Sequence, residues 1–157
     1  MPLMKPENTI DFHLRWLWLK IFRIYNTEAA NFGGTISVGY TLLNIDKEGT
    51  PSTKLGPKMG IESRSLTRTL KTMEADGLIT RTTDPVDKRV MVVRLTEDGK
   101  KYRETARNTV LDLNEYLLDH LDKNDVDTFF HVARKINTLL DEKKIFSKNH
   151  NTQPKNP

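Results

Sequence analysis

The sequence predicts a mainly helical α+β protein with one small β-hairpin near its middle. Apolar residues recur at three- and four-residue steps through most of the 157 residues, a spacing typical of amphipathic helices. Residues 78–95 instead hold two strand-like runs, LITRTT and RVMVVRL, on either side of a charged turn. The predicted order is therefore helices, a hairpin, and helices again.

The first helix is predicted over residues 9–31. One apolar set recurs at helical spacing, and a second set occupies another face. These sets are Ile10, Leu14, Leu17, Ile21 and Ile24, and Phe12, Trp16, Leu19 and Phe22. A helix that is apolar on more than one side is usually buried on more than one side. We expect it to pack on its own domain and on a second subunit; the alternative is the central helix of a monomer.

Two short helical segments follow the break at NFGGT. Ser37 is predicted to cap the first of them, which Gly49 ends. Thr50-Pro51 then resembles a cap followed by a first-turn proline. The next segment, STKLGPKMG, contains Gly56-Pro57, which is unfavourable inside a helix, so this segment is expected to be short or irregular.

A further helix is predicted over residues 62–76. Leu66, Leu70 and Met73 define one face at i, i+4 and i+7, and Gly77 is a natural C-terminal stop. After the hairpin, Thr96 can cap a helix that reaches about residue 121, with Asp98 in its first turn. Asp122 resembles the acidic cap of a last helix, and the polar tail, residues 147–157, is expected to be disordered.

Composition narrows the class of protein. The hydrophobic share is 36%, the charged share 29% and the net charge +4, which is compatible with an anionic partner without demanding one. The absence of cysteine excludes disulfides, thiolate zinc sites and thiol redox switches. We see neither a signal peptide nor a run of about 18 apolar residues that could span a membrane. We expect a soluble, cytoplasmic protein.

An enzyme is not expected. The four histidines form no pair with metal-ligand spacing, and there is no phosphate-cradling glycine loop or nucleophile elbow. DPVD lacks the regular oxygen spacing of a calcium loop. The sequence thus predicts no catalytic residue, no metal and no cofactor.

The helix at 62–76 and the hairpin together suggest contact with DNA. In a helix-turn-helix the second helix enters the major groove, and the outer face of this helix offers arginines for bases together with hydroxyls and a lysine for phosphates. The candidate DNA-binding residues there are Ser63, Arg64, Ser65, Thr67, Arg68 and Lys71. The alternative for this helix alone is a solvated basic face.

The turn of the hairpin strengthens that interpretation. Lys88 and Arg89 could reach a phosphate or a narrow minor groove, where the potential is most negative. Asp87 could pair with Arg89 and hold the shape of the turn. Since exposed salt bridges contribute only about 0–1 kcal/mol, we assign Asp87 an orienting role.

The stretch GIESRSLTRTLKTMEADGLITRTTDPVDKRVMVVRLTEDGKKY resembles the MarR (multiple antibiotic resistance regulator) family of winged helix-turn-helix repressors. The matching pieces are SLTRTL in the recognition helix, MEADGLITR before the wing, DPVDKR at its tip and VRLTEDGKKY entering the next helix. The match is strong over about residues 55–105. Gly56-Pro57 departs from the alanine usual there, which bears on the geometry of the first helix of the motif. The rival reading is a winged helix used only for protein contacts.

The resemblance implies a homodimer that binds a palindromic double-stranded DNA operator. Residues 9–35 and 100–146 would form a helical dimerisation region and residues 36–99 the winged lobe, with recognition helices one DNA turn, about 34 Å, apart. It also implies a repressor relieved by a small aromatic or acidic ligand in a cleft between the two regions. Candidate lining residues are Phe12, His13, Arg15, Trp16, Trp18 and Tyr40; alternatively, these aromatic residues are core or dimer contacts.

Overall fold

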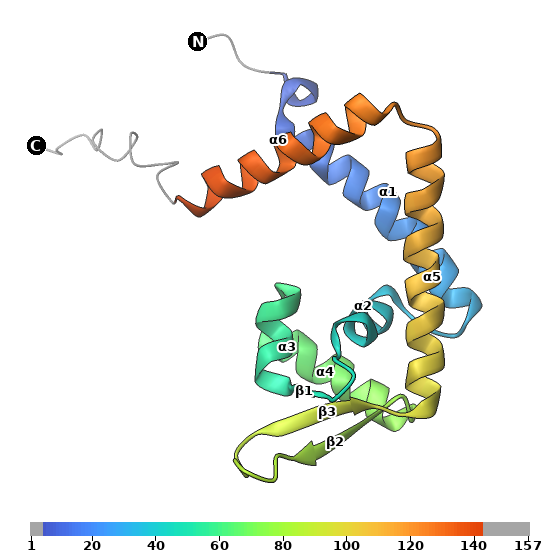
Figure 1. Cartoon of the computed structure of the whole chain (residues 1–157), viewed down its shortest axis with the longest axis vertical. Coiled ribbons are helices and arrows are strands. Elements are labelled where there is room, and N and C mark those ends of the chain that lie inside the picture. The colour runs from blue at the N-terminus through green and yellow to red at the C-terminus, as the bar shows by residue number, and fades with distance from the viewer. Residues whose placement is uncertain (1–4, 143–157) are drawn as a thin grey trace, which may run out of the picture. The chain divides into compact units, whose positions relative to one another are not determined.

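The computed structural model describes residues 5–142, which form mainly helices together with one small sheet (Figure 1). The elements in chain order are η1 (Pro6–Asn8), α1 (Ile10–Asn31), α2 (Ile36–Asn44), β1 (Thr50–Pro51), α3 (Ser52–Met59), α4 (Ser63–Ala75), β2 (Ile79–Thr83), β3 (Met91–Leu95), α5 (Glu97–Asp119) and α6 (Lys123–Asp141). The chain divides into two compact units, residues 1–112 and 113–157. The predicted mainly helical α+β class is confirmed. Within residues 5–142, no helix combines the length and the apolar character needed to span a membrane.

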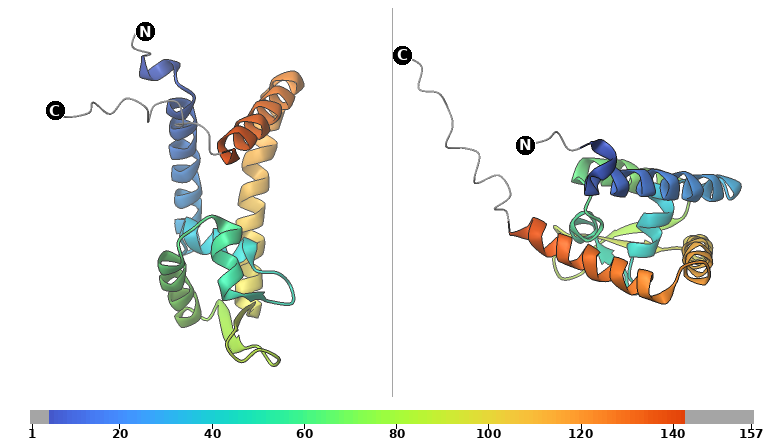
Figure 2. Two further views of the ribbon diagram at one scale, coloured as in Figure 1. Left: turned by 90° about the vertical axis from the view of Figure 1, so that its left-hand side faces the viewer. Right: turned by 90° about the horizontal axis from the view of Figure 1, so that it is seen from above.

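The first unit has one hydrophobic core. Helices α2, α3 and α4 pack with a three-stranded antiparallel sheet of order β1-β3-β2, and the β2–β3 hairpin extends beyond these helices (Figure 2). Leu66, Leu70 and Met73, the predicted inner face of α4, are all buried. Burying a leucine or methionine side chain contributes about 1.5–3 kcal/mol. This core therefore fixes α4 and the hairpin relative to one another.

Helix α2 begins earlier than predicted. Its cap is Thr35, whose hydroxyl oxygen accepts a hydrogen bond from the N–H of Val38 at 3.3 Å. The prediction of Ser37 as the cap was wrong, because the backbone becomes helical at Ile36. The predicted cap of α5 is confirmed, since Thr96 Oγ1 accepts from the N–H of Gly99 at 3.0 Å.

A third strand, β1, was not predicted. Thr50 lies opposite Val93 and Pro51 opposite Val92, so these two residues pair with β3, and Pro51 is the N-cap residue of α3 and not its first-turn proline. Proline is tolerated because β1 is an edge strand. Gly49 precedes it with φ +95°, and a side chain there would meet Arg94 Cγ at 2.8 Å and Val92 Cγ1 at 2.9 Å. Only glycine fits this approach to β3.

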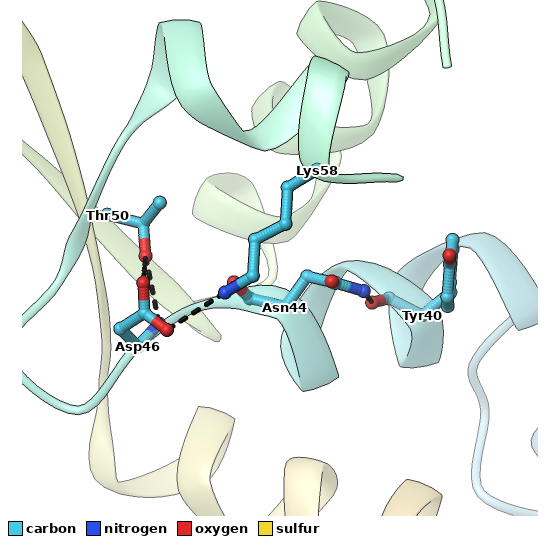
Figure 3. Close-up of polar contacts among 5 residues, drawn as sticks. All are labelled: Tyr40, Asn44, Asp46, Thr50 and Lys58. Carbon is cyan, nitrogen blue, oxygen red and sulfur yellow. Dashed lines mark hydrogen bonds and ion pairs between the residues drawn. The ribbon is translucent and has the colours of Figure 1, made fainter. Parts of the chain in front are cut away.

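Helix α3 is short, as predicted, but it is a regular helix that includes Pro57. A polar cluster fixes it to α2 and β1 (Figure 3). Lys58 Nζ donates to the carbonyl of Asn44 and to Asp46 Oδ1, each at 2.9 Å, and Asp46 Oδ2 accepts from the hydroxyl of Thr50 at 2.9 Å. Hydrogen bonds from Lys58 and Thr50 lower the pKa of Asp46. The cluster thereby holds the first helix of the helix-turn-helix in place.

Helices α1 and α6 each lack a buried residue. Exposed large apolar side chains on α1 include Ile10, Leu14, Leu17 and Trp18, and those on α6 include Phe129, Phe130, Leu139 and Leu140. Asp122 is the N-cap residue of α6, but its side chain makes no cap hydrogen bond. The tail predicted to be disordered, residues 147–157, lies outside the described residues.

Candidate nucleic-acid interface

The outer face of α4 carries three exposed cations. Arg64, Arg68 and Lys71 recur at helical spacing opposite the buried Leu66 and Leu70. Within residues 5–142, none of the three cationic groups forms an ion pair or a hydrogen bond. Their charge is thus available to an external anion.

Hydroxyl residues flank these cations. Ser63, Ser65 and Thr67 are exposed, and the Thr67 hydroxyl donates to the carbonyl of Ser63 at 2.8 Å. That bond orients the Thr67 oxygen while leaving its lone pairs able to accept. All six residues predicted on this helix therefore lie on exposed positions of α4.

The loop between β2 and β3, residues 84–90, is held by its own aspartates. Asp84 Oδ1 accepts from the N–H groups of Val86 and Asp87 at 2.8 and 3.0 Å. These two bonds lower the pKa of Asp84. Asp87 alone was predicted by number as the bracing residue, although aspartate before proline, as at Asp84, is a signal for turn initiation.

Asp87 braces the turn through a hydrogen bond to the backbone of Arg89 and not through the predicted ion pair with its side chain. Asp87 Oδ1 accepts from the backbone N–H of Arg89 at 3.0 Å, and the Arg89 guanidinium has no partner among the described residues. Lys88 is likewise exposed and without a partner in that part of the chain. The loop at the end of the hairpin (Figure 1) therefore presents two cations on a backbone that its carboxylates hold in shape.

Helix α4 and the hairpin are tied together by an ion pair. Arg81 of β2 donates from Nε to Glu74 Oε2 of α4 at 2.9 Å, and a second bond runs from Nη2 to the same oxygen. The pKa of Glu74 is lowered by these contacts. The two cationic surfaces thus belong to one lobe.

Two adjoining grooves lie in the first unit. The apolar groove, of about 610 Å³, is lined by Trp18, Phe22, Tyr25, Phe32, Ile36, Val38, Tyr40, Leu43, Met59, Ile61, Ala106 and Val110, among others. The polar groove, of about 980 Å³, adds Asn26, Ser65, Arg68, Thr69, Thr72, Asp76, Asp98 and Lys101, and both include Phe22, Phe32 and Tyr102. Among the described residues, no group of three His, Asp or Glu side chains could hold a metal ion.

The predicted ligand-binding residues fall into two groups. Trp18 and Tyr40 line the apolar groove. Phe12, His13, Arg15 and Trp16 line neither groove and instead contact one another near the start of α1, where Phe12 and Trp16 have ring centroids 6.1 Å apart.

Tyr102 was missed by the sequence reasoning. It lines both grooves, and its hydroxyl donates to the carbonyl of Phe32, which joins α5 to the end of α1.

Helices α3 and α4 followed by a basic hairpin define a winged helix-turn-helix protein. The sequence profile of the MarR family matches residues 41–91. The HTH-type transcriptional regulator SarZ of Staphylococcus saprophyticus is 31% identical over 107 residues, which cover 65% of this chain and 73% of SarZ. The chain belongs to the MarR family, whose members are transcriptional regulators and not enzymes.

Other relatives match shorter segments or share only the fold. The organic hydroperoxide resistance transcriptional regulator of Bacillus subtilis is 43% identical over 53 residues, 34% of this chain and 36% of that protein. The match thus spans about a third of this relative's length. The S. aureus MepR–DNA complex superposes with a TM-score of 0.77 at 18% identity, covering 84% of this chain and 98% of MepR. PcaV from Streptomyces coelicolor, solved with its natural ligand, gives 0.72 at 20% identity, covering 88% and 98%.

Proposed function

We propose that this protein is a homodimeric, sequence-specific DNA-binding transcriptional regulator. It represses through a palindromic operator and is released by a small aromatic or acidic ligand. The observation that carries the proposal is the pairing, on one lobe, of unpartnered cations on α4 with a basic loop braced by Asp84 and Asp87.

The two cationic surfaces suit different parts of a DNA duplex. An arginine on α4 can donate two hydrogen bonds to guanine in the major groove, where each base pair presents a distinct pattern. Lys88 and Arg89 can bind phosphates or enter a narrow minor groove. Such contacts respond to the charge and shape of DNA and do not read the bases directly. Because hydrogen bonds of Asp84 and Asp87 restrain the loop, we expect it to lose little conformational entropy when it binds. The MepR neighbour, solved with DNA, supports this use of the fold.

A second copy of the chain would cover the apolar faces of α1 and α6. Trp18 is 56% exposed on α1 and Phe129 is 54% exposed on α6. Apolar faces of this kind mark interaction sites in water. We therefore assign residues 9–35 and 100–146 to dimerisation and residues 36–99 to DNA binding.

The ligand would bind in the adjoining grooves. The apolar groove is large enough for a small aromatic molecule, and the polar groove next to it supplies hydroxyls and charge. PcaV, solved with its natural ligand, supports ligand control in this fold. Within this proposal, Trp18 and Tyr40 remain ligand-binding candidates and Tyr102 joins them.

Binding-site selection followed by fluorescence anisotropy across a salt series tests the DNA-binding proposal. Arg64→Ala and Arg68→Ala should lower affinity for the selected palindrome by about tenfold or more and relax its sequence preference. Lys88→Ala and Arg89→Ala should weaken binding to all duplexes alike and reduce the salt slope by about one each. Unchanged affinity in all four variants would refute the interface. Loss of a protein partner with intact DNA binding would favour the protein-contact alternative.

A further inference from the structure

Arg68 lies on two surfaces of the first unit at once. Ser65, Arg68, Thr69 and Thr72 recur at i, i+3, i+4 and i+7 and line the polar groove. Arg64 and Lys71, the other cations of α4, line neither groove. One of the three cations proposed to read DNA therefore also faces the space proposed for the ligand.

The acidic side chains that line the polar groove do not neutralise the charge of Arg68. Lys101 is paired with Asp98 at 3.0 Å, so these two side chains offset one another. Asp76 lies eight residues after Arg68, which is about 12 Å along the helix axis at 1.5 Å per residue. At that distance two exposed charges are largely screened at physiological salt. Near Arg68 the groove thus presents a free guanidinium among hydroxyl groups.

The polar groove is continuous with the apolar groove. Phe22, Phe32 and Tyr102 belong to both. A molecule with an aromatic body and an anionic group would place its rings among these residues and its anion toward Ser65 and Arg68. Guanidinium binds carboxylate or sulfonate through two parallel hydrogen bonds, which gives the polar groove a preference for anions at Arg68.

We propose that Arg68 binds the anion of an aromatic ligand in the groove and is thereby withdrawn from DNA. The inference rests on the proposed function. It adds a further means of control, in which the ligand and DNA compete directly for the Arg68 side chain. A guanidinium engaged by the ligand cannot also donate to a base. Because the two binding equilibria are linked, DNA must lower the affinity for the ligand by the same factor by which the ligand lowers the affinity for DNA.

The test uses 8-anilinonaphthalene-1-sulfonate and its uncharged counterpart N-phenyl-1-naphthylamine, both of which fluoresce in apolar surroundings. They are titrated into the full chain and into Arg68→Met, with Arg64→Met as the matched control. Arg68→Met should weaken sulfonate binding about tenfold or more, because a charged hydrogen bond is lost, and should leave the neutral dye unchanged. Arg64→Met should weaken DNA binding and leave both dyes unchanged.

A second titration repeats the wild-type measurements with saturating operator duplex. The sulfonate should bind several-fold more weakly, and the neutral dye should be unaffected. Absence of sulfonate binding, equal losses of both dyes in Arg68→Met, or a sulfonate loss in Arg64→Met would each overturn the anion site. Duplex binding that leaves sulfonate affinity unchanged would overturn only the competition, whereas no duplex binding by the wild type would overturn the proposed function and the competition together.

Discussion

At the residue scale, single carboxylates each organise several backbone and side-chain groups of the DNA-binding lobe. Asp84 holds two N–H groups of the wing, and Asp46 joins Lys58 and Thr50 between α2, β1 and α3 (Figure 3). Both carboxylates have a lowered pKa. These contacts are made by the charged form, so they depend on pH.

The Asp46 cluster predicts a pH dependence of stability. Because the folded pKa of Asp46 is lowered, its contribution is present above the unfolded pKa of about 3.9 and is lost as the pH falls through the folded value. Asp46→Asn should lower the thermal midpoint at pH 7, and the difference from wild type should shrink below about pH 4. Asp112→Asn, an exposed change on α5, serves as the control. A difference that persists undiminished at pH 3 would contradict the assignment.

At the scale of elements, the residue that caps α2 in the structure, Thr35, differs from Ser37, the cap that the sequence predicts. Thr35→Ala should destabilise the first unit by about 1 kcal/mol, because the N–H of Val38 loses its acceptor. Ser37→Ala should change the free energy of unfolding by only a few tenths of a kcal/mol, since Ser37 is not the cap. Urea denaturation measures both, and a larger loss in the serine variant would show that the helix begins later than described.

Elements defined by local signals could be predicted from the sequence. Helix α4 has three core residues at helical spacing and Gly77 at its end, with φ +71°, and the hairpin has alternating strands around a charged turn. Strand β1 could not be predicted, because two residues become a strand only by pairing with Val92 and Val93, which lie over 40 positions away.

The candidate site likewise contains parts that local sequence patterns predict and parts that they do not. The outer face of α4 follows from helical periodicity, and the cations of the wing follow from their place in the turn. The grooves depend on how α1, α2, α4 and α5 approach one another, which no local pattern specifies. For that reason Tyr102 was missed as a lining residue, and Phe12, His13, Arg15 and Trp16 were included.

At the scale of the whole molecule, the stability of the proposed dimer should depend on the apolar faces of α1 and α6. Leu14→Glu and Phe130→Glu should each raise the dimer dissociation constant at least tenfold, because a buried unpaired carboxylate is costly. Light scattering after size exclusion at micromolar concentration measures the mass, with 18.1 kDa expected per chain. Val86→Glu is the control, since Val86 is 94% exposed in the wing. A monomeric wild type, or dimers that survive both substitutions, would refute this assignment.

A dimer of winged lobes must bind two half-sites on the same face of DNA, and the spacing of those half-sites tests the account most directly. Five base pairs inserted at the centre of the selected palindrome rotate one half-site by about half a turn and shift it by about 17 Å. Affinity, measured by anisotropy, should then fall at least about 100-fold, toward the value for a single half-site, because the second lobe can no longer engage. Equal affinity for the original and the lengthened palindromes would contradict a dimer that reads a palindromic operator with two copies of α4.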